Sequence, residues 1–130
     1  FSLAGKKILA AEDNTLNAEI LIFLLDDMGA DRVLVEKGKQ VVEAFKESDW
    51  DEYDCILMDV MMPIMDGYTA TRRIRGLSRP DAQSIPIIAL TANAFAEDRK
   101  KAMEAGMNDH VAKPVDMKVL TAVLQKYLEK

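Results

Sequence analysis

Two patterns of hydrophobic and polar residues alternate along the chain. Short apolar runs predict strands at Lys7–Ala11, Arg32–Glu36, Cys55–Met58, Ile87–Leu90 and His110–Ala112. Apolar residues that recur at steps of three and four predict helices at Asn14–Met28, Gly38–Ser48, Gly67–Arg75, Ala96–Ala105 and Met117–Leu128. Strands that alternate with helices in this way are typical of one α/β domain, here with five strands and five helices.

The inner strands indicate a parallel sheet. Cys55–Met58 and Ile87–Leu90 are continuously apolar, as strands covered by helices on both faces are. Because crossovers between parallel strands are right-handed, the pattern predicts an open, doubly wound sheet. The segment Gly76–Pro86 is the most loop-like part of the chain, since it combines glycine, serines and prolines.

Polar residues follow the predicted strands where each strand ends. Glu12 and Asp13 come after the first strand, and Asp59 comes after Cys55–Met58. The later strands are followed by Thr91 and Ala92, and by Lys113 and Pro114. Open parallel sheets bind ligands at the carboxyl ends of their strands, so these residues form a candidate site.

Three carboxylates at one edge of a sheet are costly unless something compensates their charge. Two carboxylates about 4 Å apart repel by roughly 4 kcal/mol at an effective dielectric constant near 20. Protons or a cation relieve this repulsion, and oxygen ligands without His or Cys favour Mg²⁺ or Mn²⁺. A lysine and a threonine beside such an ion can hold phosphoryl oxygens, and an aspartate can accept a phosphoryl group covalently.

Each of these residues also has an ordinary explanation. Glu12 and Asp13 can belong to a helix cap in a solvated loop. Lys113 can be a surface lysine, and the Thr91 hydroxyl can cap the turn after its strand. None of these explanations accounts for all five polar side chains lying at one edge, which favours a functional site.

The composition restricts the class of protein further. The chain has 130 residues and a net charge of −5, which argues against nucleic-acid binding because phosphate backbones attract clustered Lys and Arg. It contains no apolar run of membrane-spanning length and no signal-peptide pattern. The one cysteine, Cys55, lies in an apolar run and fits a buried residue in a reducing compartment. We therefore expect a cytoplasmic domain that binds neither nucleic acid nor membrane itself, in a parent protein that can be membrane-anchored.

Four motifs resemble the receiver domain of two-component response regulators. They are "AEDN" at Ala11–Asn14, "LMDVMMPIMDG" at Leu57–Gly67, "ALTA" at Ala89–Ala92 and "AKP" at Ala112–Pro114. The resemblance implies a flavodoxin-like fold with strand order 2-1-3-4-5. It also implies that residues 1–130 form a single receiver domain, with residues 1–5 as a linker or as residues added for expression.

The resemblance implies a phosphoacceptor and a metal site. Asp59 resembles the aspartate that accepts a phosphoryl group from a phosphohistidine. Asp13 resembles a direct Mg²⁺ ligand, and Glu12 a ligand that acts through water. The backbone carbonyl of Met61 resembles a further ligand, so its side chain has no need to be polar.

The resemblance also assigns the contacts of the phosphoryl group. Lys113 and Thr91 are expected to hold its oxygens, assisted by the backbone N–H of Ala92, whose small side chain leaves room. The bond between Lys113 and Pro114 is expected to be cis. Met61 and Asn93 are expected to flank the site and to influence how long the acyl phosphate survives.

His110 departs from the family pattern, which has Tyr or Phe at that position. Inward movement of Thr91 on phosphorylation is expected to let the His110 ring rotate. The alternative is a ring packed between strand and helix whose rotation does not report phosphorylation. A histidine also titrates near neutral pH, which Tyr and Phe do not.

The expected partners follow from the same resemblance. A sensor histidine kinase or a histidine phosphotransfer domain is the expected phosphodonor, and the chain is most similar in style to receivers fused to hybrid histidine kinases. A phosphorylation-dependent homodimer is left open. The expected partner surface is formed by the segments Ala96–Ala105, His110–Ala112 and Met117–Leu128, with contributions from Phe95, Met107 and Tyr127.

Two other functions compete with phosphoacceptance and self-dephosphorylation. One is a metal-dependent phosphatase with an aspartyl nucleophile, although such sites usually place a second acid where this chain has Met61. The other is a protein-binding pseudo-receiver that is never phosphorylated, although such domains usually lack an acid or the lysine that this chain keeps.

Overall fold

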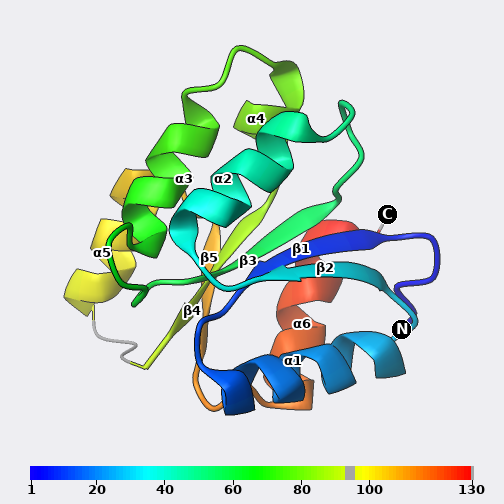
Figure 1. Cartoon of the computed structure of the whole chain (residues 1–130). Helices are drawn as coiled ribbons and strands as arrows, with labels where there is room; N and C mark the ends of the chain where they lie inside the picture. The colour runs from blue at the N-terminus through cyan, green and yellow to red at the C-terminus, as the bar shows by residue number, and fades with distance from the viewer. Residues whose placement is uncertain (93–95, 130) are drawn as a thin grey trace.

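The chain forms a five-stranded parallel sheet with helices on both faces (Figure 1). The computed structural model describes residues 1–92 and 96–129. The strands are β1 (Lys7–Ala11), β2 (Asp31–Val35), β3 (Cys55–Asp59), β4 (Ile87–Thr91) and β5 (Asp109–Ala112). Their order is β2-β1-β3-β4-β5 and all neighbours are parallel, which confirms the doubly wound topology.

Two layers of helices cover the sheet. The helices are α1 (Thr15–Asp27), α2 (Gly38–Glu47), α3 (Gly67–Arg75), α4 (Pro80–Ser84), α5 (Ala96–Ala105) and α6 (Met117–Leu128). α1 and α6 lie on one face, and α2, α3 and α5 lie on the other (Figure 1). None of the helices in the described part of the chain is long and apolar enough to cross a membrane.

Each inner strand serves two hydrophobic cores because its side chains alternate between the faces of the sheet. In β3, Ile56 and Met58 join the core under α2 and α3, whereas Cys55 and Leu57 join the core under α1 and α6. This two-sided burial explains the uninterrupted apolar run that the sequence shows. Cys55 is fully buried, and burial raises the pKa of its thiol, so it acts as a small apolar filler.

The expectation of five helices is wrong, since the described residues contain six. The additional helix, α4, lies in the segment predicted to be a loop, and Pro80 occupies its first turn. Arg79, just before α4, is buried and pairs with Asp81 at 2.6 Å. Its guanidinium also donates to the backbone carbonyls of Phe45 (2.9 Å) and Ser48 (3.0 Å) at the end of α2. These contacts order the segment, and its local composition does not reveal them.

The first residues of the chain are part of the packed structure. Leu3 is fully buried against the core under α1 and α6. Its N–H donates to the Met28 carbonyl at 2.8 Å. Leu3 therefore belongs to the fold, although it falls within the residues 1–5 that were expected to form a linker.

Candidate functional site

The sheet register brings the strand-end residues together at one edge. Glu12 follows the last residue of β1, and Asp59 ends the neighbouring strand β3. On the other side of β3, Thr91 ends β4 and pairs with Ala112, the last residue of β5. The next residue, Lys113, donates its backbone N–H to the Thr91 carbonyl at 2.8 Å. Four strands thus contribute side chains to one site.

Three carboxylates and one ammonium group form the centre of this site. Carboxylate oxygens of Glu12, Asp13 and Asp59 lie within 4.8 Å of one another. Lys113 Nζ is 2.9 Å from Asp59 Oδ1 and 3.2 Å from Glu12 Oε1. Glu12 and Asp59 are each only 1% exposed, whereas Asp13 is exposed. The single lysine compensates one of three negative charges, so the site holds excess negative charge.

Two buried carboxylate oxygens accept no hydrogen bond from the described residues. They are Glu12 Oε2 and Asp59 Oδ2. A buried acceptor without a donor costs about 1–3 kcal/mol, and more when it is charged. Carboxylate oxygens of Glu12, Asp13 and Asp59 together form a set of the hard oxygen ligands that Mg²⁺ or Mn²⁺ prefers. These residues therefore fit a divalent cation.

The crowding of charge shifts the pKa values of three groups. Burial, followed by the neighbouring Glu12 carboxylate, raises the pKa of Asp59, although Lys113 opposes this effect. Partial burial of the carboxyl and the nearby Asp59 raise the pKa of Asp13. Burial alone would lower the pKa of Lys113, but Asp59 and Glu12 outweigh it and the pKa is raised. Lys113 therefore stays charged, while the acids resist carrying three charges together.

The loop between β3 and α3 approaches the site closely. The Met61 N–H donates to Asp59 Oδ1 at 3.2 Å, and the Met61 side chain is 74% exposed. A Cβ atom on Gly67 would lie 2.3 Å from the Asp59 carbonyl oxygen, so only glycine fits there. The sequence marked Gly67 as the start of a helix but gave no sign of this contact. The Asp66 side chain caps α3 through the Thr69 N–H at 2.8 Å.

Thr91 of β4 and His110 of the neighbouring strand β5 line the same small cavity. The cavity measures about 10 Å³ and is also lined by Tyr68 of α3. That space holds about one water molecule, so an imidazole ring enters it only if its neighbours move. His110 Nδ1 lies 3.6 Å from Asp109 Oδ1 in the same strand.

The other residues singled out from the sequence are placed as follows. Ala92 is exposed directly after β4. The bond between Lys113 and Pro114 is cis, as the resemblance implies. Met107 is buried in the core, and Tyr127 donates its hydroxyl to the Asn108 carbonyl at 2.9 Å. Two further residues of the sequence prediction, Asn93 and Phe95, lie outside the described residues.

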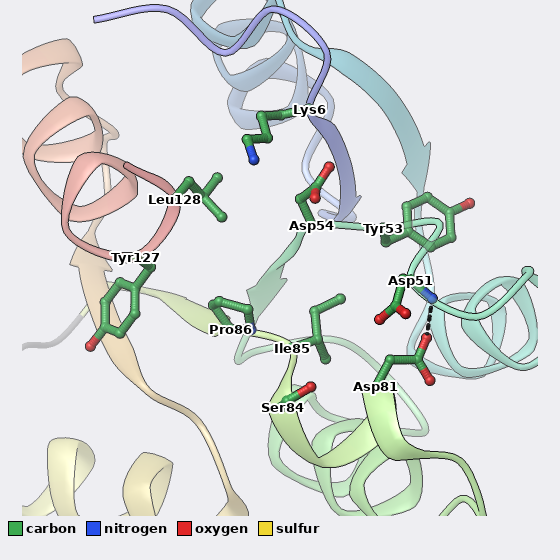
Figure 2. Close-up of a pocket in the computed structure, with 10 residues that line it drawn as sticks. All are labelled: Lys6, Asp51, Tyr53, Asp54, Asp81, Ser84, Ile85, Pro86, Tyr127 and Leu128. Atoms are coloured by element: carbon green, nitrogen blue, oxygen red, sulfur yellow. Dashed lines mark hydrogen bonds between the residues drawn. The ribbon is translucent and has the colours of Figure 1, made fainter. Parts of the chain in front are cut away.

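A larger hollow lies at the opposite end of the sheet (Figure 2). Its volume is about 320 Å³, and its lining includes Lys6, Asp54 and Pro86, which precede β1, β3 and β4. The acids there are held by the fold itself. Asp54 accepts the Lys7 N–H at 2.8 Å, and Asp81 accepts the Asp51 N–H at 2.8 Å. This hollow therefore adds no chemistry to the acid cluster.

Known proteins resemble this chain over nearly its whole length. A family model described as the response regulator receiver domain matches residues 8–125. Hybrid signal transduction histidine kinase I of Dictyostelium discoideum is 42% identical over 95% of this chain, which covers 8% of that protein. Sensor protein GacS of Pseudomonas syringae pv. syringae is 39% identical over 97% of this chain, which covers 14% of that protein. The chain thus spans a small part of these curated relatives.

Solved structures show the same fold. One is the receiver domain of the Pseudomonas aeruginosa sensor histidine kinase PA1611, crystallised with a magnesium ion coordinated in its active site cleft. It has a TM-score of 0.86 and 41% identity, covering 98% of this chain and 100% of that chain. Another is the Saccharomyces cerevisiae receiver domain of Ssk1 with the histidine phosphotransfer protein Ypd1, with a TM-score of 0.83 and 28% identity over 94% of this chain and 88% of that chain. The chain belongs to the response regulator receiver domain family of two-component phosphorelay proteins.

Proposed function

We propose that Asp59 accepts a phosphoryl group from a phosphohistidine of a partner protein, and that residues 1–130 act as one receiver domain. The observation that carries this proposal is the environment of the Asp59 carboxylate. One oxygen is held by Lys113 at 2.9 Å, while the other is buried without a donor among the described residues. A carboxylate placed at a strand end and crowded by two acids is unfavourable for stability alone, which supports a chemical role.

The transfer step needs few groups from the protein. A carboxylate oxygen of Asp59 attacks phosphorus while the bond from phosphorus to the donor histidine nitrogen breaks, and the imidazole leaves with that electron pair. Lys113 holds a phosphoryl oxygen, and Thr91 with the Ala92 N–H holds another. Positioning and charge compensation supply most of the catalysis in such a transfer. Hydrolysis later restores the carboxylate and releases inorganic phosphate, so the domain dephosphorylates itself.

A divalent cation is part of the proposal. Asp13, Asp59 and the Met61 carbonyl would hold Mg²⁺ or Mn²⁺ directly, and Glu12 would act through water. The bound cation supplies positive charge that compensates the acids and the phosphoryl oxygens. The relative of known structure with magnesium in its cleft supports this assignment by similarity.

The readout is proposed to pass through Thr91 and His110. Both residues line one cavity, so inward movement of Thr91 changes the space beside the His110 ring. The surface formed by α5, β5 and α6 would then meet a partner. A sensor histidine kinase or a histidine phosphotransfer protein is the proposed donor, in a cytoplasmic setting, and a phosphorylation-dependent homodimer remains a separate expectation.

Intact-mass spectrometry with a small acyl phosphate as phosphodonor tests the proposal. The protein is incubated with donor plus Mg²⁺, with donor plus EDTA, and as the Asp59→Asn variant with donor plus Mg²⁺. We expect a mass gain of one phosphoryl group only in the first sample. Asp66→Asn is a matched control, because Asp66 caps α3 and lies outside the acid cluster.

The same experiment and a parallel phosphatase assay separate the competing functions. Absence of any mass gain, with the protein folded and a known receiver modified in parallel, would favour a protein-binding pseudo-receiver. Sustained release of phosphate from generic phosphomonoesters would favour a phosphatase. Either result would refute phosphoacceptance by Asp59 as the main activity.

A further inference from the structure

His110, the only histidine of the chain, lies between two hollows. One is the cavity of about 10 Å³ that it shares with Thr91. The other is a groove of about 200 Å³ between α5 and β5, whose lining includes Met103 and Met107. The ring is 29% exposed, so water reaches it in this conformation, which we call the outward position. Rotation into the cavity would bring the ring to an enclosed, inward position.

In the outward position the ring lies beside a carboxylate. His110 Nδ1 is 3.6 Å from Asp109 Oδ1, and the His110 backbone N–H donates to the same oxygen at 2.8 Å. The other Asp109 oxygen is 3.7 Å from Lys126 Nζ of α6, so the lysine offsets part of the charge of the carboxylate. A protonated ring is attracted to Asp109 and keeps part of its water, so the outward position favours the charged imidazolium.

The cavity favours the neutral ring instead. Besides the apolar Val60, Ala89 and Ala102, the side chains that line it with His110 are Thr91 of β4, Tyr68 of α3, and Asp98 and Arg99 of α5. Asp98 and Arg99 carry opposite charges, so together they give an imidazolium little net attraction. A protonated ring that moves inward loses water and its contact with Asp109, and burial of a charge costs far more than burial of a neutral polar group. A proton on the ring therefore opposes the inward position.

This opposition connects the proton to the phosphoryl group. In the proposed readout, the ring moves inward after Thr91 has moved towards the phosphoryl group on Asp59. We infer that a proton on His110 resists this step, so that the receiver responds less readily to phosphorylation as pH falls through the range in which imidazole titrates. Because the coupling between two bound groups is reciprocal, the phosphoryl group must weaken proton binding at His110 by the same factor. This inference rests on the proposed function and adds its regulation by pH.

Proton NMR of the His110 ring measures this coupling, since a chain with one histidine gives one imidazole Hε1 resonance. The protein is titrated from about pH 8 to about pH 5 with Mg²⁺ alone, and with Mg²⁺ plus beryllium trifluoride, an analogue of the phosphoryl group that needs no donor. Fluorine NMR monitors the bound analogue over the same range. We expect the midpoint of the His110 titration to fall by about one pH unit when the analogue is bound, which is a tenfold loss of proton affinity.

Two variants separate the contributions to this shift. Asp109→Asn keeps the shape of the outward partner and removes its charge, so the His110 midpoint without the analogue should fall and the difference between the two titrations should shrink. His110→Phe keeps a ring that binds no proton. Both this variant and the wild type contain the site acids that bind protons as pH falls, so the ratio of their dissociation constants for the analogue isolates the effect of His110.

The ratio and the midpoint decide the outcome. We expect the dissociation constant of the wild type, divided by that of His110→Phe, to rise by about fivefold from about pH 7.5 to about pH 5.5, as a midpoint that shifts from about 6.5 to about 5.5 requires. A constant ratio would overturn the inference, as would a His110 midpoint that stays or rises when the analogue binds. If the analogue fails to bind the wild type in Mg²⁺ at every pH, the proposed function is wrong and the inference falls with it.

Discussion

Removal of one carboxylate from the acid cluster should stabilise the protein when no divalent cation is present. The substitution is Asp13→Asn, which keeps the size of the side chain and removes its charge. Asp13 lies within 4.8 Å of both Glu12 and Asp59, and at that limiting separation two unit charges repel by about 3.5 kcal/mol at an effective dielectric constant near 20. Lys113 offsets part of this repulsion, and water screens the exposed Asp13. We therefore expect a gain of about 1–2 kcal/mol in the free energy of unfolding.

Magnesium should reverse the order of stability. At a concentration one hundred times its dissociation constant, a ligand that binds only the folded state adds about 2.7 kcal/mol. The wild type should gain this amount, whereas Asp13→Asn should gain less because it has lost a proposed direct ligand. The variant is thus expected to be the more stable protein in EDTA and the less stable protein in saturating Mg²⁺.

Urea unfolding followed by circular dichroism measures both quantities. Glu19→Gln is the control, because Glu19 is an exposed acid of α1 with no ion pair among residues 1–92 and 96–129. We expect the control to change stability by less than about 0.5 kcal/mol in either buffer. A variant that is less stable than the wild type in EDTA would refute the idea that the three carboxylates repel one another in the folded protein.

Three further predictions concern pH, the buried ion pair and the close approach at the site. In EDTA, the carboxyls of Asp13 and Asp59, whose pKa values are raised, bind protons more tightly in the folded than in the unfolded state, so the free energy of unfolding should rise as pH falls from 7 towards about 5. At lower pH, protonation of Asp81, whose pKa is lowered, should reverse the trend. A monotonic decrease in stability from pH 7 downwards, measured by urea unfolding, would contradict this prediction. Arg79→Ala should lower the free energy of unfolding by about 3 kcal/mol because it leaves Asp81 buried and unpaired, and a loss below about 1 kcal/mol would show that the pair does not order this segment. Gly67→Ala should lower the free energy of unfolding, measured by heat or urea, by about 1–3 kcal/mol because the added Cβ meets the Asp59 carbonyl oxygen. Gly76→Ala is the control and should be close to neutral, since the nearest atom to its Cβ is 3.4 Å away; equal effects of the two substitutions would contradict the close approach at Gly67.

The positions of the inner strands were predictable from the sequence because a strand that is buried on both faces is an uninterrupted apolar run. Both cores draw on β3 and β4, so every residue of these strands is apolar up to Asp59 and Thr91. The sequence prediction stopped β3 and β4 one residue short, because a polar side chain at a strand end looks like the start of a loop. The juxtaposition of the site followed from parallel topology alone, since all strands end at the same edge.

Features that depend on distant contacts were not predictable. α4 was missed because Arg79 is ordered by carbonyls of α2 that lie more than thirty residues away in the sequence. The requirement for glycine at residue 67 comes from the Asp59 carbonyl, and the left-handed backbone of Ile64 contradicts the local preference of isoleucine. Local patterns report which face of an element is buried, whereas these features depend on what lies against it.

The most direct test of the central claim is to locate the phosphoryl group within the protein. After reaction with a small acyl phosphate and Mg²⁺, borohydride reduces an aspartyl phosphate to homoserine, and peptide mass spectrometry identifies the residue that has changed. We predict homoserine at position 59, dependent on Mg²⁺, with Glu12 and Asp13 unchanged. Modification at another residue, or an unmodified Asp59 in a protein that has gained a phosphoryl group, would contradict the assignment of Asp59 as the phosphoacceptor.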